Sequence, residues 1–194
     1  MNKVLTIISI CIERGINKVI SFLYFLILKL RGLQGGWGVN ITFNSVIKGW
    51  LCNVYLGKNV VFHNGVRLII SRNSKLILKD RAWVSAYTSI ITMPNTKIEI
   101  GKNTMFGPNC ILVSADHNIN DKLSLRDSGH TVGDILIGDN CWIGANTVIT
   151  KGITIGQGAI IGACSVVTKD IPAMSVAVGQ PAKVIKRRCI NKKL

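Results

Sequence analysis

The chain has 194 residues, which is enough for one domain with a continuous buried core. It carries 24 lysines and arginines against nine aspartates and glutamates, a formal net charge of +15 that favours an acidic small ligand, an anionic polymer or an anionic membrane surface as partner. Nucleic acid is not expected, because the basic residues are scattered through turns without an aromatic-basic platform or a helix-turn-helix pattern.

Residues 1–33 are predicted to be an apolar helical segment. Its two apolar runs, Val4–Ile12 and Val19–Leu28, are too short to span a bilayer, which takes about 20 residues. No small-residue cleavage motif follows, so a secretory signal is not expected and the protein is placed in the cytoplasm. A helix this apolar on both faces either is buried in an oligomer or lies in a membrane interface with its lysines toward lipid phosphates. Both hypotheses stay open, and the second implies peripheral contact with the inner face of the cytoplasmic membrane.

Residues 34–172 are predicted to be a solenoid built on a six-residue repeat. An aliphatic residue returns every six positions, at Ile137, Ile143, Ile149, Ile155, Ile161 and Val167. A period of six fits neither a helix nor a single amphipathic strand, but it fits short strands and turns, three of which close a triangular coil. Earlier triplets begin at Leu56, Leu78 and Ile100, 22 residues apart, so each early coil carries a four-residue corner insertion. Residues 34–50 are expected to be a lead-in coil.

The fourth position of the hexad predicts a left-handed turn conformation. Asparagine, which tolerates that conformation, occupies it at Asn59, Asn103, Asn109, Asn140 and Asn146. Cys164 departs from this preference and predicts a strained or relaxed turn. The six cysteines form no CxxC pair and no metal-ligand spacing, so we expect reduced structural thiols and no metal.

One segment, residues 113–136, interrupts the repeat and is predicted to be an inserted loop. The phase of the hexads is lost once, between Leu112 and Ile137. The segment holds four of the nine acidic residues and two of the three histidines, and such a loop carries function more often than the coils do. After Pro172 the repeat is expected to end, leaving residues 173–194 as a basic C-terminal tail that covers the open prism.

Two segments carry a resemblance to a known family: residues 141–146, Cys-Trp-Ile-Gly-Ala-Asn, and residues 162–172, Gly-Ala-Cys-Ser-Val-Val-Thr-Lys-Asp-Ile-Pro. Together with the hexads, over about residues 56–188, they resemble the hexapeptide-repeat acyltransferases. The similarity is to the branch that holds galactoside and maltose acetyltransferases and the O-acetyltransferases of bacterial surface polysaccharides. It implies an all-β solenoid, the left-handed parallel β-helix, assembled as a homotrimer with acetyl-CoA in a cleft between neighbouring prisms.

The resemblance implies a histidine base at the start of the inserted loop, and His117 stands there, 25 residues before Trp142. An alcohol attacks a thioester at neutral pH only if its proton is removed as the bond forms. A neutral imidazole can take that proton and then protonate the departing thiolate. The carboxylate that orients His117 is left open among Asp116, Asp121, Asp127 and Asp134. His130, in the same loop, is interpreted as an exposed histidine.

By resemblance, Trp142 walls the cleft near His117, and Asp116 and Tyr87 are further candidates for contact with the acceptor. Sugar acetyltransferases hold the acceptor with an asparagine in the region where this chain has Tyr87-Thr88-Ser89, so the acceptor side differs from that of galactoside acetyltransferase. The small Ala145 and Ala163 are expected along the pantetheine arm. The positions that the resemblance assigns to the rest of the anionic donor are Thr168 and Lys169 at the adenosine end and Lys183 and Lys186 near the phosphates.

We therefore predict an acetyl-CoA-dependent O-acetyltransferase that acts on a saccharide hydroxyl in bacterial surface polysaccharide biosynthesis. An N-acetyltransferase for an amino-sugar nucleotide is the rival within the same class. A γ-type carbonic anhydrase would need His63, His117 and His130 as zinc ligands, and His63 lies about two and a half coils before His117. A non-catalytic scaffold would not need the Asp-His loop or the two family segments.

Overall fold

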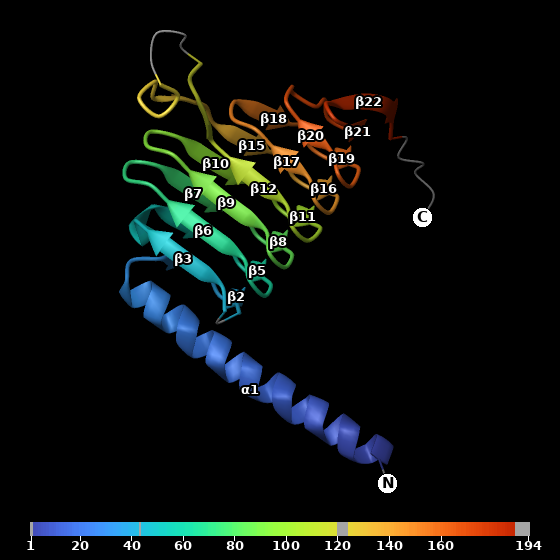
Figure 1. The fold of residues 1–194 in the computed structure, drawn as a ribbon. Coiled ribbons are helices and arrows are strands. Elements are labelled where there is room, and N and C mark those ends of the chain that lie inside the picture. The colour runs from blue at the N-terminus through green and yellow to red at the C-terminus, as the bar shows by residue number, and fades with distance from the viewer. Residues whose placement is uncertain (1, 43, 120–123, 189–194) are drawn as a thin grey trace.

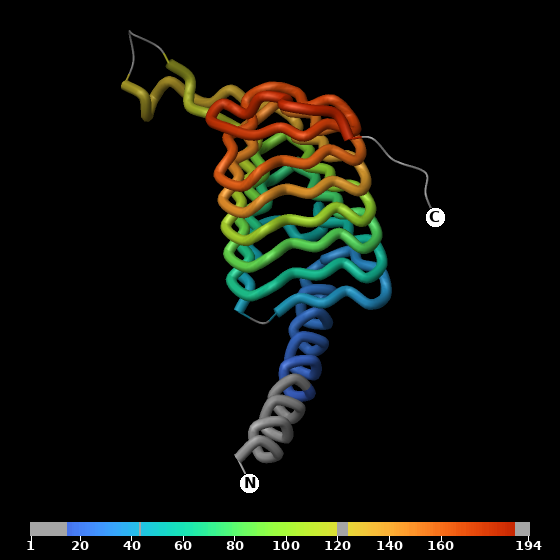
Figure 2. The backbone as a smooth tube through the Cα atoms, turned by 90° about the vertical axis from the view of Figure 1, so that its right-hand side faces the viewer, coloured from blue at the N-terminus to red at the C-terminus, as the bar shows by residue number. Residues whose placement is uncertain are grey.

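The computed structural model describes residues 2–42, 44–119 and 124–188, with side chains from Gly15 onward. The chain forms a left-handed parallel β-helix, a triangular prism whose three faces are parallel sheets (Figures 1 and 2). One helix, α1 (Asn2–Leu30), lies at the lower end of the prism, where the chain begins. The predicted all-β solenoid with an N-terminal helix is confirmed.

Each coil contributes strands to three sheets, which we number in the order in which the chain visits them. The first sheet contains β1 (Gln34–Gly35), β4 (Val54–Leu56), β7 (Lys75–Leu78), β10 (Lys97–Ile100), β15 (Ile135–Ile137) and β18 (Ile153–Ile155). The second contains β2 (Asn40–Ile41), β5 (Val61–Phe62), β8 (Trp83–Val84), β11 (Met105–Phe106), β16 (Trp142–Ile143), β19 (Ile160–Ile161), β21 (Ser175–Gly179) and β22 (Ala182–Arg187). The third contains β3 (Val46–Gly49), β6 (Arg67–Ile70), β9 (Ser89–Thr92), β12 (Ile111–Val113), β17 (Val148–Ile149) and β20 (Val166–Val167). Outside these sheets lie the short 3-10 helix η1 (Leu51–Asn53) and the strands β13 (Ala115–His117) and β14 (His130–Val132).

The three edges of the prism serve as landmarks. The first edge joins the first sheet to the second, the second edge joins the second sheet to the third, and the third edge joins the third sheet back to the first. Neighbouring strands within each sheet are parallel, except that β22 runs antiparallel to β21. Each residue in a strand therefore has a counterpart one coil above or below it.

The hexad residues form the core of the prism. The six aliphatic residues that define the repeat are at most 3% exposed. Their phase continues across the inserted segment, because Ile100 lies opposite Ile137 and Phe106 lies opposite Ile143. The insertion therefore leaves the stacking of the coils intact.

The predicted left-handed turns are present. The five asparagines at the fourth hexad position have φ between 55° and 60°. Cys164 adopts the same conformation with φ of 58°, so its turn is strained rather than relaxed. Arg81 and Tyr87 also have φ of 60°, which the sequence did not indicate. Side chains this large rarely occupy the left-handed region, so these two positions store backbone strain.

The lower end of the prism is closed by α1. Residues 34–50, expected to be a lead-in coil, form the complete first coil of the prism, since β1, β2 and β3 each pair with a strand of the coil above. The repeat is hidden there because Gly35 occupies an inward position. Phe25 of α1 fills the space, and a Cβ on Gly35 would lie 3.1 Å from its ring. Among the described residues, no helix combines the length and the apolar character that crossing a membrane requires.

At the upper end, parallel pairing continues beyond Pro172, where we expected the repeat to end. β21 runs parallel to β19 with Ile161 opposite Ala177, and β22 then returns along β21. Gly179 provides the left-handed turn between these last two strands, with φ of 106°. The described part of the C-terminal segment is thus a hairpin that extends the second sheet.

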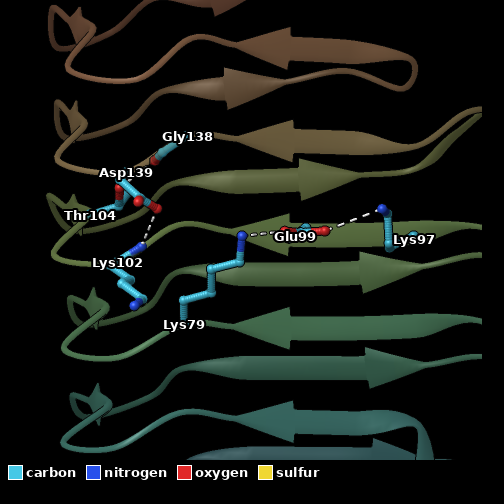
Figure 3. A network of polar contacts seen from close by, with 7 residues as sticks. All are labelled: Lys79, Lys97, Glu99, Lys102, Thr104, Gly138 and Asp139. Carbon is cyan, nitrogen blue, oxygen red and sulfur yellow. Dashed lines mark hydrogen bonds and ion pairs between the residues drawn. The ribbon is translucent and has the colours of Figure 1, made fainter.

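Polar contacts tie the coils together across the inserted segment (Figure 3). On the outer face of the first sheet, the Glu99 carboxylate lies 2.6 Å from Lys79 Nζ and 3.1 Å from Lys97 Nζ. The hydrogen bond from Lys79 lowers the pKa of Glu99, and the same bond raises the pKa of Lys79. One coil higher, Asp139 accepts the backbone N–H of Lys102 at 2.7 Å, although 37 residues separate the two. The coils below and above the inserted segment are therefore joined directly, although the insertion separates them in the sequence.

Candidate functional site

The inserted segment contains a β-hairpin arm that leaves the prism at the third edge, between β12 and β15 (Figure 2). Its root is Ser114, whose buried hydroxyl lies 2.7 Å from the Thr96 hydroxyl and accepts the Met93 N–H at 2.8 Å. On the returning side, Gly133 N–H donates to the Ser114 carbonyl at 3.0 Å. These bonds hold both ends of the arm against the prism, so β13 leaves it in a fixed direction.

His117 is the last residue of β13, and its side chain is exposed. Directly across the arm lies His130, the first residue of β14. The two ring centroids are 4.3 Å apart and the ring planes are inclined by 40°. His130, expected to be an unremarkable exposed histidine, is thus the described side chain that stacks against His117. No sequence signal could have revealed this contact, because the pairing register of a long hairpin is not set by a short turn.

The sequence leaves four carboxylates as candidates to orient His117: Asp116, Asp121, Asp127 and Asp134. Asp116 precedes His117 on β13, so its side chain points to the opposite face of the arm, where it lies 3.1 Å from Lys151 Nζ. Asp134 accepts a backbone N–H of β10 at 2.7 Å, and Asp127 accepts a hydrogen bond from the hydroxyl of Ser124. Asp121 lies outside the described residues. Among the described carboxylates, none has a hydrogen bond or ion pair with His117.

Ala145 and Ala163 occupy the same position of successive coils at the second edge. The Ala145 carbonyl accepts the N–H of Cys164 at 2.8 Å, which joins the two coils. A Cβ on Gly144 would collide with the backbone of Ala163, so the coils approach closely at this edge. The backbone of the two alanines therefore takes part in the stacking of the coils, while their side chains consist of a single methyl group each.

Tyr87 lies at the same edge, two coils below Ala145. Its side chain is 64% exposed, and its ring covers Gly65 of the coil beneath, where an added Cβ would lie 2.5 Å from the ring. The strained backbone of Tyr87 is thus combined with an exposed phenol. Strain of this kind often marks a residue held for function.

The remaining predicted residues lie in other places. Thr168 and Lys169 are exposed at the third edge, one coil above Lys151, the partner of Asp116. Trp142 points outward from the middle of the second sheet, between Met105 below and Ile160 above, and is 40% exposed. The two C-terminal lysines, Lys183 and Lys186, are exposed on β22, the outermost strand of that sheet.

A single chain therefore does not bring all the predicted site residues together. The arm with His117 stands at the third edge, with Thr168 and Lys169 above it on the same edge. Ala145 and Ala163 lie at the second edge, and the whole width of the third sheet separates the two edges. A site that uses both edges has to include a second copy of the chain.

Other chemistry-bearing side chains lie apart from the arm. His63 contacts Trp83 on the lower part of the second sheet, with ring centroids 4.8 Å apart, so it does not join the other two histidines. Across the described ranges, no three His, Cys, Asp or Glu side chains gather into a metal site. Burial raises the pKa of the Cys110 thiol to about 11, which keeps this packed sulfur protonated. The arm thus remains the candidate for acid–base chemistry.

Comparison with known proteins places these features in context. The family model described as bacterial transferase hexapeptide (six repeats) matches residues 134–169. WcaF of Escherichia coli K12, provisionally named a colanic acid biosynthesis acetyltransferase, is 35% identical over 176 residues, which cover 81% of this chain and 92% of WcaF. The crystal structure of a maltose O-acetyltransferase from Clostridium difficile 630 superposes with a TM-score of 0.61, and the match covers 91% of this chain and 87% of that one. The two sequences are 30% identical.

Two comparisons are more limited. A mutant of AntD, an N-acyltransferase from Bacillus cereus, has a TM-score of 0.72 and covers 84% of this chain and 87% of that one, but at 22% identity the likeness shows the fold alone. Several curated acetyltransferases match over only 32% to 46% of their own length, so the chain spans less than half of those proteins.

Proposed function

Because the chain belongs to the hexapeptide-repeat acyltransferases, we propose that it is an acetyl-CoA-dependent O-acetyltransferase that acts on a saccharide hydroxyl. The similarity to WcaF over most of both chains supports a role in bacterial surface polysaccharide biosynthesis. The observation that carries the proposal is the arm at the break in the repeat, which presents an exposed His117 beside a basic edge.

In this mechanism His117 is the general base. An imidazole nitrogen takes the proton of the acceptor hydroxyl while the hydroxyl oxygen bonds to the thioester carbonyl carbon. Backbone N–H groups stabilise the oxyanion of the tetrahedral intermediate. When the intermediate collapses, the carbon–sulfur bond breaks and the imidazolium returns the proton to the CoA thiolate. His130, stacked 4.3 Å away, restricts the orientation of the His117 ring during these steps.

The donor site is completed by a neighbouring copy in a homotrimer. The arm of one prism faces the second edge of the next, so acetyl-CoA lies between His117 and the alanine pair of the neighbour. An exposed apolar column on the second sheet supports this contact between copies, since Trp83, Met105 and Trp142 lie in register and are each at least 40% exposed. Thr168, Lys169, Lys183 and Lys186 supply hydrogen bonds and positive charge to the nucleotide end of CoA.

An N-acetyltransferase for an amino-sugar nucleotide would use the same arm differently. An amine that is already unprotonated needs less help from a base than an alcohol does. Loss of the imidazole should therefore leave substantial activity toward an amine and very little toward a hydroxyl. The identity of the new bond, ester or amide, can be read by NMR of the product.

We place the activity in the cytoplasm, next to the membrane through residues 1–33. This location suits an acceptor that is assembled on a lipid carrier or as a polymer at the inner face of the membrane. The exposed apolar side chains of α1 support it.

The test is His117→Ala, with His63→Ala as a matched control on a histidine outside the arm. CoA release is followed with a thiol reagent in the presence of glycan acceptors, and acetyl-CoA binding is measured by calorimetry. We expect His117→Ala to lower kcat by about 10²–10⁴-fold with acetyl-CoA affinity unchanged, and His63→Ala to match the wild type. Unchanged turnover in His117→Ala would refute the assignment of the base.

A further inference from the structure

Helix α1 has two apolar faces, and the prism covers only one of them. Ser21, Phe25 and Leu28 are at most 8% exposed and pack beneath the first coil. The large apolar side chains on the rest of the described helix are 36% to 90% exposed: Ile16, Val19, Ile20, Phe22, Leu23, Leu26, Ile27 and Leu30. At about 100° per residue, these eight form one continuous stripe on the side opposite the three buried residues. The stripe is too large to be an ordinary solvent-facing surface.

The charge around this stripe is of one sign. From Arg14 to Lys79 the chain has ten lysines and arginines and no aspartate or glutamate. This range runs from α1 through the two lowest coils to the end of β7 in the third coil, all at the end of the molecule that carries the helix (Figure 1). That end is therefore basic. Around the helix, Lys18 and Lys29 lie at one margin of the stripe and Arg31 lies toward the other. An anionic surface would be attracted to this end of the prism.

Two tryptophans of the first coil have the exposure expected near a lipid interface. Trp37 is 88% exposed and Trp50 is 50% exposed. The guanidinium of Arg72 lies over the ring of Trp50, 5.6 Å from its centroid. An indole beside a cation is common where protein meets lipid headgroups, because the ring is amphipathic and the cation reaches phosphate.

We propose that α1 is an interfacial anchor that docks on a bilayer rich in anionic lipid. Its free stripe lies at the boundary between headgroups and acyl chains, and the prism is carried on the opposite face of the helix. A second copy of the chain is a poorer occupant, because the two margins of the stripe carry only positive charges (Lys18, Lys29 and Arg31), which a seam between two such helices would bring together. Anionic headgroups neutralise these charges instead. Each cation near the surface then strengthens binding to the bilayer by roughly fivefold.

This placement deepens the proposed function, on which the following step rests. The arm follows β12, three strands above β3 of the first coil, so it stands about 14 Å higher along the prism at about 4.8 Å per strand. His117, at the end of β13, is therefore held about three coils above the first coil. The acceptor that fits is a membrane-attached glycan long enough to reach this level, rather than the sugar next to the lipid.

The anchor is tested by flotation of the full-length protein with vesicles. One set contains equal parts of phosphatidylcholine and phosphatidylglycerol, and the other contains phosphatidylcholine alone. We expect the wild type to float with the anionic vesicles, and the double variant Leu23→Glu with Ile27→Glu to bind at least about tenfold more weakly. Lys18→Gln should weaken binding about fivefold. Leu125→Glu, the same kind of change at an exposed leucine of the arm, is the matched control and should bind as the wild type does.

Point variants are preferred to deletion of α1, because Phe25 and Leu28 close the prism and their loss would expose its core. Equal binding of the wild type and the double variant, or no binding to anionic vesicles, would overturn the proposal. So would a wild-type oligomer that falls apart in the double variant by light scattering, since a second copy would then cover the stripe. His117→Ala should still float, so failure of the anchor and failure of the proposed chemistry give different results.

Discussion

Mixed assembly of two inactive variants tests whether the acyl-transfer site is shared between subunits. His117→Ala removes the proposed base from the arm at the third edge. Ala163→Trp places an indole at the second edge, where the donor is proposed to lie, and leaves the arm unchanged. Each variant alone should therefore lack activity, for two different reasons located on two different edges of the prism.

The expected recovery follows from the geometry. Within one chain the third sheet separates the arm from Ala163, so each site takes the arm from one subunit and the second edge from the next. A trimer that contains both variants always has one site of three with both parts intact, so the purified mixed trimers should recover about a third of wild-type activity. If one chain supplied both parts, no site would be intact.

The assay uses co-expression with two different affinity tags, so that only mixed oligomers are purified. CoA release is measured with saturating acetyl-CoA, and light scattering reports the oligomeric state. Circular dichroism of each variant alone checks that Ala163→Trp keeps the β-helix. Mixed oligomers that stay inactive would refute the shared site, as would an active wild-type monomer.

Three further predictions concern single positions. Gly35→Val should lower the stability by about 1–3 kcal/mol in thermal unfolding, because its side chain would displace the ring of Phe25, and an unchanged melting temperature would contradict that packing. Tyr87→Asn should raise the stability by about 1 kcal/mol, because asparagine tolerates the φ of 60°, while kcat/KM for the acceptor falls; an unchanged kcat/KM would remove Tyr87 from the acceptor site. The pKa of Glu99 is lowered from its ordinary value of 4.5, so its carboxylate stabilises the fold above that value and this contribution is lost as the pH falls through the lower, folded-state pKa. Urea unfolding between pH 6 and about pH 3 should thus show a smaller loss of stability in Glu99→Gln than in the wild type, and parallel curves would contradict this.

The inward positions and the turns could be predicted because they are local. Each hexad specifies one strand by its aliphatic residue and one turn by the asparagine at its fourth position. Stacking the coils repeats this unit, so no further sequence signal is needed to predict it. Ile100 opposite Ile137 shows that this holds even across the arm. The first coil was expected, but its hexads were not recognised, because the inward Gly35 is completed by Phe25 through a contact between strand and helix that no sequence period contains.

The candidate site was less accessible to sequence reasoning. The break in the repeat indicated the position of the arm and of His117, because an interruption of the six-residue period can be recognised in the sequence as readily as the period itself. The partner of His117 was not visible, because the contact with His130 depends on the pairing register of the hairpin. Asp116 illustrates the same limit: it is adjacent to His117 in the chain, but alternation along β13 sends it to Lys151 on the other face. The relation of the arm to Ala163 depends on assembly, which one sequence does not encode in any local pattern.

The two ends of the prism are suited to separate tasks because a solenoid transmits little along its axis. Each coil contacts only the coils next to it, so α1 and the basic lower coils can bind a surface without altering the arm. The distribution of acidic residues agrees with this division: apart from Glu13, they begin at Asp80 and are densest in the inserted segment, far from the helix. The C-terminal hairpin is basic as well, but the lower end combines its positive charge with the exposed apolar stripe of α1. If α1 docks on the bilayer as proposed, the number of coils between helix and arm sets the distance from the membrane at which a glycan meets His117.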